Sequence, residues 1–390
     1  MNAPAGPQRL LNRAYLSLFL INMIVSASFA MVATTVSLYV TGFGATTAVA
    51  GTVVGSLSIA SLCIRPFSGI LSDKLNRKML LVVAMLGIGI AMAGCGLTQS
   101  IPLLLLFRIM HGLFFSIATT VTMALVAGSV PEDKMAQGLA YFAVGQTITA
   151  AFAPTLGIGL GERFGFPATL LSAAALSLVA MGLALFIIPA QPKRPARPAR
   201  RLAVTDFFSR EALPFGILAI VVSGATGLEN SFIALFGQEL SLGNVGWYFT
   251  IGASALFASR LLSGRLADRH AVPVIFAGLG LMAAAFILLG FATPGNAVVL
   301  FTLAAMLKAF GLGAVQPTLQ ASSMRAVPVE RRGAASSTYY LGADIGQALT
   351  PVLGGIVAAK QGYHTMFNLF ALPLLAGVGF AVWLRRRKTI

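Results

Sequence analysis

The chain has 390 residues, of which 57% are apolar and only 10% are charged, and its mean hydropathy is +0.87. Because a soluble domain carries roughly a quarter charged residues, this composition excludes a water-soluble globular fold. The net charge of +16 is spread over several short loops instead of one groove or helix face, which argues against binding to nucleic acid.

The apolar residues are grouped into runs of about 20 to 25, the length that crosses a hydrocarbon core of ~30 Å as an α-helix. They do not alternate with polar residues as in the strands of a membrane β-barrel. The first run is too long for the apolar core of a signal peptide, so we expect it to remain as a helix. In chain order, the twelve predicted helices span 14–40, 46–71, 78–98, 101–127, 136–160, 166–189, 214–238, 243–267, 273–292, 296–322, 333–359 and 365–385.

Lysine and arginine in the loops lie almost entirely on one side of the predicted membrane. The loops on the other side carry only Arg163 and Lys360. By the positive-inside rule, both termini and the central loop are cytoplasmic. The sequence therefore predicts a multi-pass protein of a bacterial cytoplasmic membrane, with the lipid bilayer as a partner, and we expect it to be a monomer.

The chain repeats itself at half its length. Four residues recur 195 positions later: Arg65, Ser68, Gly69 and Asp73 return as Arg260, Ser263, Gly264 and Asp268. Three more recur at 197 positions: Gly145, Pro154 and Gly157 return as Gly342, Pro351 and Gly354. The Pro-rich basic segment between the copies is predicted to be an extended linker. We therefore divide the chain into a six-helix half at 1–189, a cytoplasmic linker at 190–213 and a second six-helix half at 214–390, related by an axis along the membrane normal.

Three motifs resemble those of the major facilitator superfamily. The loop after the second helix contains Gly69-x3-Asp73-x3-Arg77-Lys78, with Asn76 where that pattern has glycine. The segment LLLLFRIMHG at 103–112 is similar to the family's fourth-helix motif. AFAPTLG at 151–157 and TPVLGG at 350–355 resemble the motif of its antiporter branch, although Ala153 and Ile158 replace glycine in the first copy.

This resemblance covers the whole chain and implies an all-α membrane fold of twelve transmembrane helices that works by alternating access. It also implies that Gly69, Asp73 and Arg77 form a latch, which meets the eleventh helix in the outward-facing state. The alternative is that Asp73 only caps its helix near the positive end of a neighbouring helix.

Two carboxylates lie deep in predicted helices, Glu229 and Asp344, each ~13 to 17 Å from a membrane surface at 1.5 Å per residue. A charge at this depth costs about 2.5 to 3.5 kcal/mol even on the mildest scale, so it is normally kept for function. A carboxyl group removed from water takes up a proton more readily, so either residue is a candidate proton carrier. Alternatively, Glu229 makes a fixed hydrogen bond to another helix, and Asp344 forms an ion pair with Lys308 that holds the second half together.

Arg108 is the third candidate for proton coupling, because the family's corresponding arginine is implicated in proton transfer. Here the first helix carries Asn22 but no carboxylate, so Arg108 is alternatively a ligand for a substrate carboxylate or for backbone carbonyls. His111 lies one turn later on the same helix face and is expected to be a packing residue. Arg65 and Arg260 are predicted to extend toward the cytoplasmic membrane surface as anchors.

Polar and aromatic residues within the spans predict a cavity for an amphiphilic organic molecule: Asn22, Tyr39, Phe115, Gln146, Phe232, Lys308, Gln316, Tyr340 and Gln347. We predict a secondary active transporter that exports a small drug-like or metabolite-like compound in exchange for protons. It needs no cofactor besides the proton gradient, since no ATP-binding loop of the Gly-x4-Gly-Lys type occurs. The alternative is proton-coupled import of an anionic nutrient held by Arg108 or Lys308. A membrane-embedded receptor or enzyme is a remote alternative, and no catalytic or metal-binding cluster is recognisable.

Overall fold

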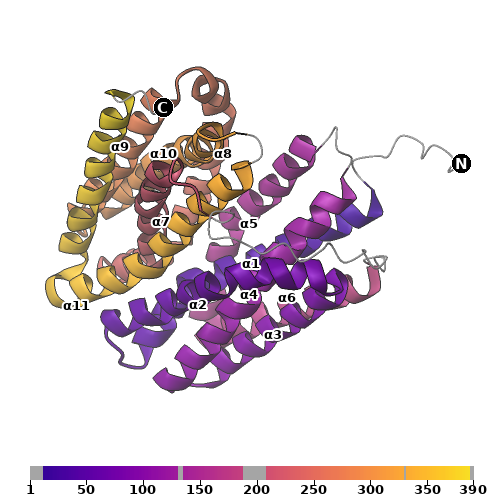
Figure 1. The fold of residues 1–390 in the computed structure, drawn as a ribbon. Coiled ribbons are helices and arrows are strands. Elements are labelled where there is room, and N and C mark those ends of the chain that lie inside the picture. Colours follow the sequence, from indigo (N-terminus) through magenta and orange to yellow (C-terminus); the bar gives the residue numbers. More distant parts are fainter. Residues whose placement is uncertain (1–11, 131–134, 188–207, 329–330, 387–390) are drawn as a thin grey trace, which may run out of the picture.

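The computed structural model describes residues 12–130, 135–187, 208–328 and 331–386, and these ranges contain helices and no strand (Figure 1). The helices are α1 (Arg13–Gly42), α2 (Thr47–Lys74), α3 (Arg77–Leu97), α4 (Ile101–Ser129), α5 (Met135–Phe164), α6 (Phe166–Ile187), α7 (Leu213–Glu239), α8 (Gly246–Arg269), α9 (Ala271–Gly290), α10 (Ala297–Arg325) and α11 (Arg332–Arg386).

The longest helix, α11, is interrupted at Gly362, where the backbone takes φ 80° and ψ 170°. It therefore contains both of the last two predicted spans, and the prediction of twelve helices is confirmed. Among the described residues, nine helices are long and apolar enough to cross a membrane, with α11 counted once. The other two, α5 and α8, carry polar side chains where they meet each other.

Short polar caps explain several helix starts. The side chains of Asn12, Thr46 and Asn76 each accept a hydrogen bond from the backbone N–H three residues later. Such a cap satisfies one of the free N–H groups of the first helical turn. Asn76, which replaces a glycine of the family pattern, has φ −65° and so needs no glycine; it serves as the N-cap of α3.

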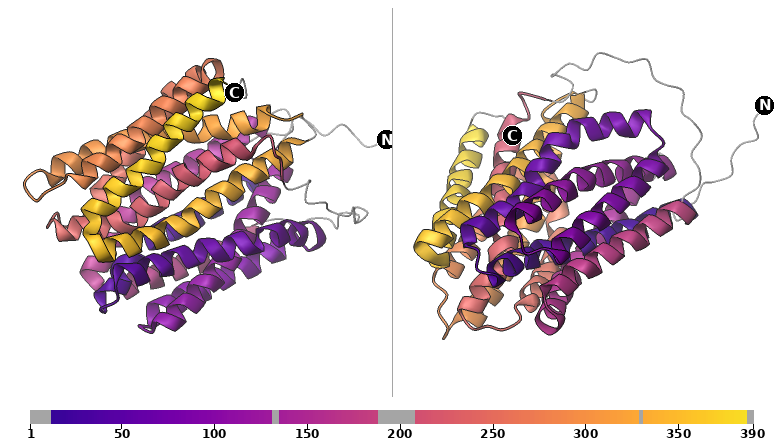
Figure 2. Two further views of the ribbon diagram at one scale, coloured as in Figure 1. Left: turned by 60° about the vertical axis from the view of Figure 1, so that its left-hand side comes forward. Right: turned by 90° about the horizontal axis from the view of Figure 1, so that it is seen from below.

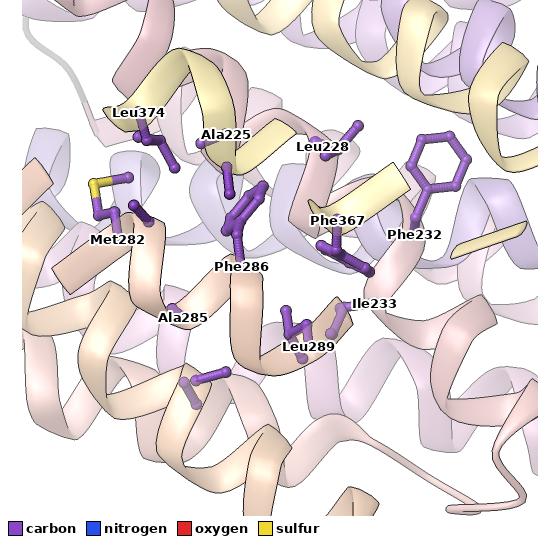
Figure 3. Close-up of a cluster of buried hydrophobic side chains, with 14 of the residues drawn as sticks. Ala225, Leu228, Phe232, Ile233, Met282, Ala285, Phe286, Leu289, Phe367 and Leu374 are labelled. Carbon is purple, nitrogen blue, oxygen red and sulfur yellow. The ribbon is translucent and has the colours of Figure 1, made fainter. Parts of the chain in front are cut away.

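The helices form two bundles, α1–α6 in indigo to magenta and α7–α11 in rose to yellow (Figures 1 and 2). Each bundle contains a buried apolar cluster, and Leu38 of α1 and Ile158 of α5 join the cluster of the second bundle. In the second, Phe286 of α9 packs against Phe367 of α11 with ring centroids 5.5 Å apart (Figure 3). The bundles are therefore joined by an apolar contact as well as by polar groups.

The two bundles meet chiefly along two seams, α2 against α11 and α5 against α8, and α1 also contacts α7. We call the side where α2 ends at Lys74 the basic face, and the side where α1 ends at Gly42 the outer face. In the first seam, the backbone of α2 touches α11: a Cβ added to Gly55 would lie 2.5 Å from the Ala348 carbonyl oxygen. In the second seam, the Thr155 hydroxyl donates to the Gly246 carbonyl at 2.7 Å. Both of these close contacts lie toward the outer face.

The α2 helix loses this close packing toward the basic face. A Cβ added to Gly69 would meet no atom within 4 Å, whereas one added to Gly51 would overlap the carbonyl oxygen of Pro351. Arg65 bridges the distance between α2 and α11 with its long side chain instead. The bundles are thus tightly packed toward the outer face and less so toward the basic face.

Candidate functional site

A cavity of about 380 Å³ lies between the two bundles. Six helices contribute to its wall: α1, α4 and α5 from the first half and α7, α8 and α10 from the second. Its lining side chains include Ser26, Phe29, Thr34, Phe115, Gln146, Thr149, Thr226, Glu229, Asn230, Tyr248, Phe249, Leu256 and Lys308. The size is within the range of about 300 to 1,000 Å³ that is typical of small-molecule sites.

The wall from the first half is apolar and aromatic, with hydroxyl and amide groups. Phe29 of α1 and Phe115 of α4 stack with ring centroids 4.7 Å apart and an interplanar angle of 18°. None of the described lining residues of α1, α4 and α5 is charged. This side can therefore bind an apolar or aromatic surface but supplies no counter-ion.

The wall from the second half carries a buried ion pair. Lys308 Nζ of α10 lies 3.0 Å from Glu229 Oε1 of α7, and the two side chains are only 11% and 3% exposed. The Tyr248 hydroxyl of α8 is close enough to interact with the same carboxylate. Among the described residues, however, neither Glu229 Oε2 nor the Tyr248 hydroxyl has a partner with good hydrogen-bond geometry. Buried polar atoms usually have a partner, so these two groups at the cavity wall can still accept or donate a hydrogen bond.

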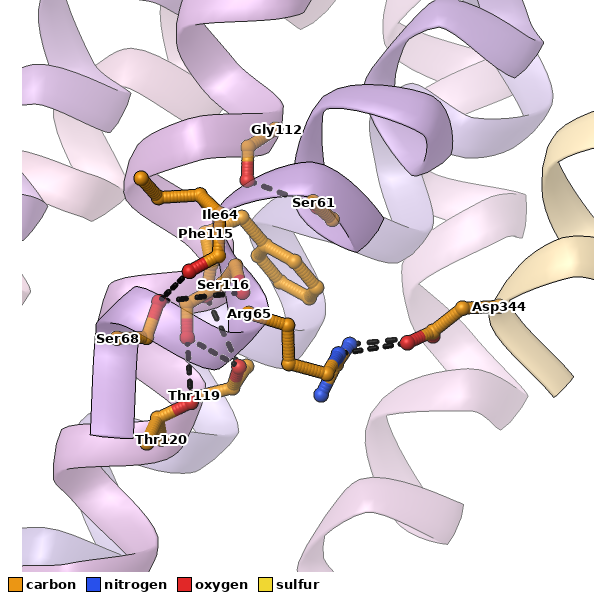
Figure 4. Close-up of polar contacts among 10 residues, drawn as sticks. All are labelled: Ser61, Ile64, Arg65, Ser68, Gly112, Phe115, Ser116, Thr119, Thr120 and Asp344. Atoms are coloured by element: carbon orange, nitrogen blue, oxygen red, sulfur yellow. Dashed lines mark hydrogen bonds and ion pairs between the residues drawn. The ribbon is translucent and has the colours of Figure 1, made fainter. Parts of the chain in front are cut away.

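The predicted Lys308–Asp344 ion pair is wrong. Lys308 pairs with Glu229, and Asp344 of α11 pairs with Arg65 of α2 in the other half (Figure 4). Arg65 Nε lies 2.6 Å from Asp344 Oδ2 as an ion pair, and Arg65 Nη2 donates to Oδ1 at 3.1 Å. Counting residues along a helix gives the depth of a side chain but not the face from which it projects.

The predicted anchoring roles of Arg65 and Arg260 are also wrong. Both side chains bond to a residue of the other half. Arg65 reaches Asp344, and the Arg260 guanidinium of α8 donates to the Thr147 hydroxyl of α5 at 2.7 Å.

Arg108 lies away from the cavity lining. Its side chain is buried in the first half, where Nε donates to the Val53 carbonyl of α2 at 3.3 Å. Its Nη1 lies 3.3 Å from His111 Nδ1, so the two side chains share a helix face as predicted. Among the described residues, Arg108 forms no ion pair with a carboxylate.

The other predicted lining residues divide into two groups. Phe115, Gln146 and Lys308 line the cavity, and Asn22 lies behind Gln146, whose amide nitrogen is 3.5 Å from the Asn22 side-chain oxygen. The remaining five predicted residues do not line this cavity. Tyr39 donates to the Thr98 carbonyl, Phe232 packs against Tyr363, and the Gln316 carbonyl accepts from Tyr339. The Tyr340 hydroxyl accepts from Gln320, and Gln347 is exposed.

Phe29 and Tyr248 were missed by sequence reasoning. A signal for Phe29 existed, because Asn22, Ser26 and Phe29 recur at helical spacing and so share one face of α1. Tyr248 carries no such signal, since its role depends on how α8 is rotated toward Glu229.

The residues of the predicted latch lie at the basic end of α2. Gly69 faces open space, and Arg77 holds its own bundle together by donating to the carbonyls of Ser72 at 2.9 Å and Ala124 at 3.5 Å. The side chain of Asp73 lies outside the described residues. The latch therefore stays a prediction for the opposite state of the protein.

Comparison with known proteins matches residues 18–243 and 215–389 to the family described as the Major Facilitator Superfamily. The multidrug resistance protein MdtG of Escherichia fergusonii is 27% identical over 388 residues, which cover 94% of this chain and 93% of that protein. MdtG of a Rahnella species is 24% identical over 382 residues, covering 94% and 92%.

Solved structures show the same fold. A bacterial homologue of the human lysosomal transporter Spinster, in an inward-facing and occupied conformation, aligns with a TM-score of 0.80 and 17% identity over 98% of both chains. The nucleoside transporter NupG aligns with a TM-score of 0.78 and 14% identity over 95% of this chain and 98% of its own.

Proposed function

Because the chain belongs to the major facilitator superfamily, we propose that it is a secondary active transporter that exports a small organic compound in exchange for protons. The cavity between the halves and the names of the MdtG relatives support this direction. The cavity is complete within one chain, so a monomer suffices. The basic face is the cytoplasmic one by the positive-inside rule. Because the halves are packed closely toward the outer face and less closely toward the basic face, this arrangement corresponds to an inward-facing state. Membership in a transporter family leaves the receptor and enzyme alternatives without support.

The observation that carries the proposal is the Glu229 carboxylate at the cavity wall, of which only Oε1 has an ion-pair partner among the described residues. Lys308 holds Oε1 at 3.0 Å, while Oε2 has no well-aligned partner among the described residues. A proton and a hydrogen-bond donor of the substrate would therefore compete for Oε2. This competition produces exchange: a proton taken up from outside displaces the substrate, and a substrate entering from the cytoplasm displaces the proton. Arg108, away from this cavity, would have only an indirect role.

The cavity also defines the class of compound. The Phe29–Phe115 stack offers an apolar surface opposite a wall that contains Glu229, Lys308 and Tyr248. We infer that the substrate combines a flat or ring-shaped apolar body with at least one hydroxyl, amide or ammonium donor. Gln146, Thr149 and Asn230 provide further hydrogen-bonding groups on the same cavity.

Import by symport is the second candidate, and Lys308 is the observation that favours it. Protonation of Glu229 would leave the Lys308 ammonium without its counter-ion, so an anionic substrate could bind there together with the proton. Proton and substrate would then move in the same direction. The two mechanisms differ in the sign of the coupling, which can be measured directly.

The test uses purified protein in liposomes that contain a pH-sensitive dye, with aromatic amines and aromatic acids supplied as outward or inward gradients. Antiport predicts that protons move against the compound, and Glu229→Gln should abolish the proton flux. Glu239→Gln, an exposed change at the end of the same helix, is the matched control. Protons moving with the compound would replace export by the symport candidate. If Glu229→Gln behaved like the control, Glu229 would not be the proton carrier.

A further inference from the structure

The two seams between the halves are copies of each other. Helices α2 and α8 are related by the 195-residue repeat, and α5 and α11 by the 197-residue repeat. Gly55 corresponds to Thr250, and Ala348 corresponds to Ala151. Gly55 lies against the Ala348 carbonyl in one seam, and the Thr250 hydroxyl donates to the Ala151 carbonyl at 3.0 Å in the other. The repeat also relates the Arg65–Asp344 pair to the Arg260–Thr147 hydrogen bond.

The equivalent arginines differ in what they meet. Arg65 meets the carboxylate of Asp344, which neutralises its charge, whereas Arg260 meets only the hydroxyl of Thr147. Among the described residues, Arg260 has no carboxylate partner. An uncompensated cation at membrane depth is costly, so this site favours an anion.

Arg260 is placed where a transported compound would pass. Tyr248, Gly252 and Leu256 of α8 all line the cavity at a spacing of four residues, and Arg260 is the next residue on that face. It lies ~18 Å from Tyr248 along the helix axis, toward the basic face. On α5, Thr147 lies between the lining residues Gln146 and Thr149.

We propose that Arg260, positioned by Thr147, is an oxyanion-binding position at the basic end of the cavity, and that it receives the carboxylate of an acidic organic substrate. The equivalent seam displays the geometry: Arg65 offers Nε and Nη2 to the two oxygens of Asp344 at 2.6 and 3.1 Å. A guanidinium group suits this two-point recognition better than an ammonium. This inference rests on the proposed function, because it takes the cavity as the transport path.

Binding of benzoate to the purified full-length protein tests the proposal, with benzamide as the uncharged probe of the same shape. Thermal shift in low-salt buffer gives the apparent Kd. We expect benzoate, but not benzamide, to raise the Tm. Arg260→Gln should weaken benzoate binding by about 10- to 100-fold, the effect of losing a charged hydrogen-bonding group. Arg163→Gln, an exposed change at the outer end of α5, is the matched control and should leave the benzoate Kd unchanged.

A second variant keeps the test independent of any damage from Arg260→Gln. Thr147→Asp retains Arg260 but supplies a carboxylate at the place where Asp344 stands in the other seam, so it should also weaken benzoate binding. Thr147→Ser should not. The proposal is overturned if benzoate does not stabilise the wild type, if binding survives in Arg260→Gln, or if both arginine variants lose it equally. Any of these results with intact proton exchange in liposomes would refute this inference and leave the proposed antiport standing.

Discussion

The Lys308–Glu229 pair makes a quantitative prediction about stability. Lys308→Met removes the cation while an apolar side chain of similar length still fills the space. It leaves the Glu229 carboxylate, only 3% exposed, without the ammonium 3.0 Å away. Removing one partner of a buried pair costs about 3 to 5 kcal/mol.

Proton uptake sets an upper limit on this cost. Glu229 can escape the penalty by becoming neutral, which at pH 7 costs about 3.7 kcal/mol for a carboxyl whose pKa in water is near 4.3. The destabilisation should therefore shrink by about 1.4 kcal/mol for each pH unit that the medium is acidified. Glu229→Gln should also destabilise, by leaving the Lys308 ammonium alone, but acidification should not relieve it. The double variant buries no charge and should be more stable than either single variant.

Thermal unfolding in detergent at pH 7 and pH 6 measures these differences. Lys360→Met provides the matched control, because Lys360 is exposed at the outer face. If Lys308→Met were as mild as Lys360→Met, or if the two single effects simply added in the double variant, the pair would contribute no coupling and the description of the site would be wrong.

Two further predictions concern the seams and the exposed charges. Gly51→Leu should prevent the close packing of α2 on the Pro351 carbonyl and so shift the protein toward the outward-facing state. The shift should be measurable as faster labelling of a cysteine placed at the outer seam. Gly42→Leu is the control and should not change the labelling rate, because its side chain enters open space. The hydrogen bond from Ser209, with a smaller contribution from Arg331, holds the pKa of Glu211 below its ordinary value of 4.5. Glu211 therefore stabilises the fold above that pH and loses this effect as the pH falls through its lowered pKa. Accordingly, Glu211→Gln should lower the Tm at pH 7. It should have no effect on the Tm at a pH well below the lowered pKa, where Glu211 is protonated. An equal Tm difference at both pH values would refute the assignment.

The sequence was sufficient for the helices because burial in lipid constrains length and composition so strongly. Runs of apolar residues predicted the spans, and the repeat of Arg65 and Gly69 as Arg260 and Gly264 predicted two copies of one unit. The last two spans were separated correctly, although α11 continues through the break at Gly362. These features depend on local patterns, which a single sequence displays.

Pairing between helices could not be predicted in the same way. Lys308 and Asp344 were placed at similar depth, but α10 and α11 turn these side chains toward different neighbours, Glu229 and Arg65. Tyr39 and Phe232 likewise lie within spans but not on the cavity face. The rotation of each helix is decided by packing against several others, and that information is distributed over the whole chain.

The two deep carboxylates, which the sequence presents as equivalent, have different consequences for alternating access. Glu229 and Lys308 belong to the same half, so a rigid-body movement of the halves leaves their geometry intact, and the same groups can serve a substrate from either side of the membrane. Asp344 and Arg65 belong to opposite halves, so any rocking changes their separation. Protonation of Asp344 would therefore act on the equilibrium between states, whereas protonation of Glu229 would act on substrate binding. On this basis, replacing Asp344 should alter which face is open without abolishing proton coupling, whereas replacing Glu229 should abolish proton coupling without altering which face is open.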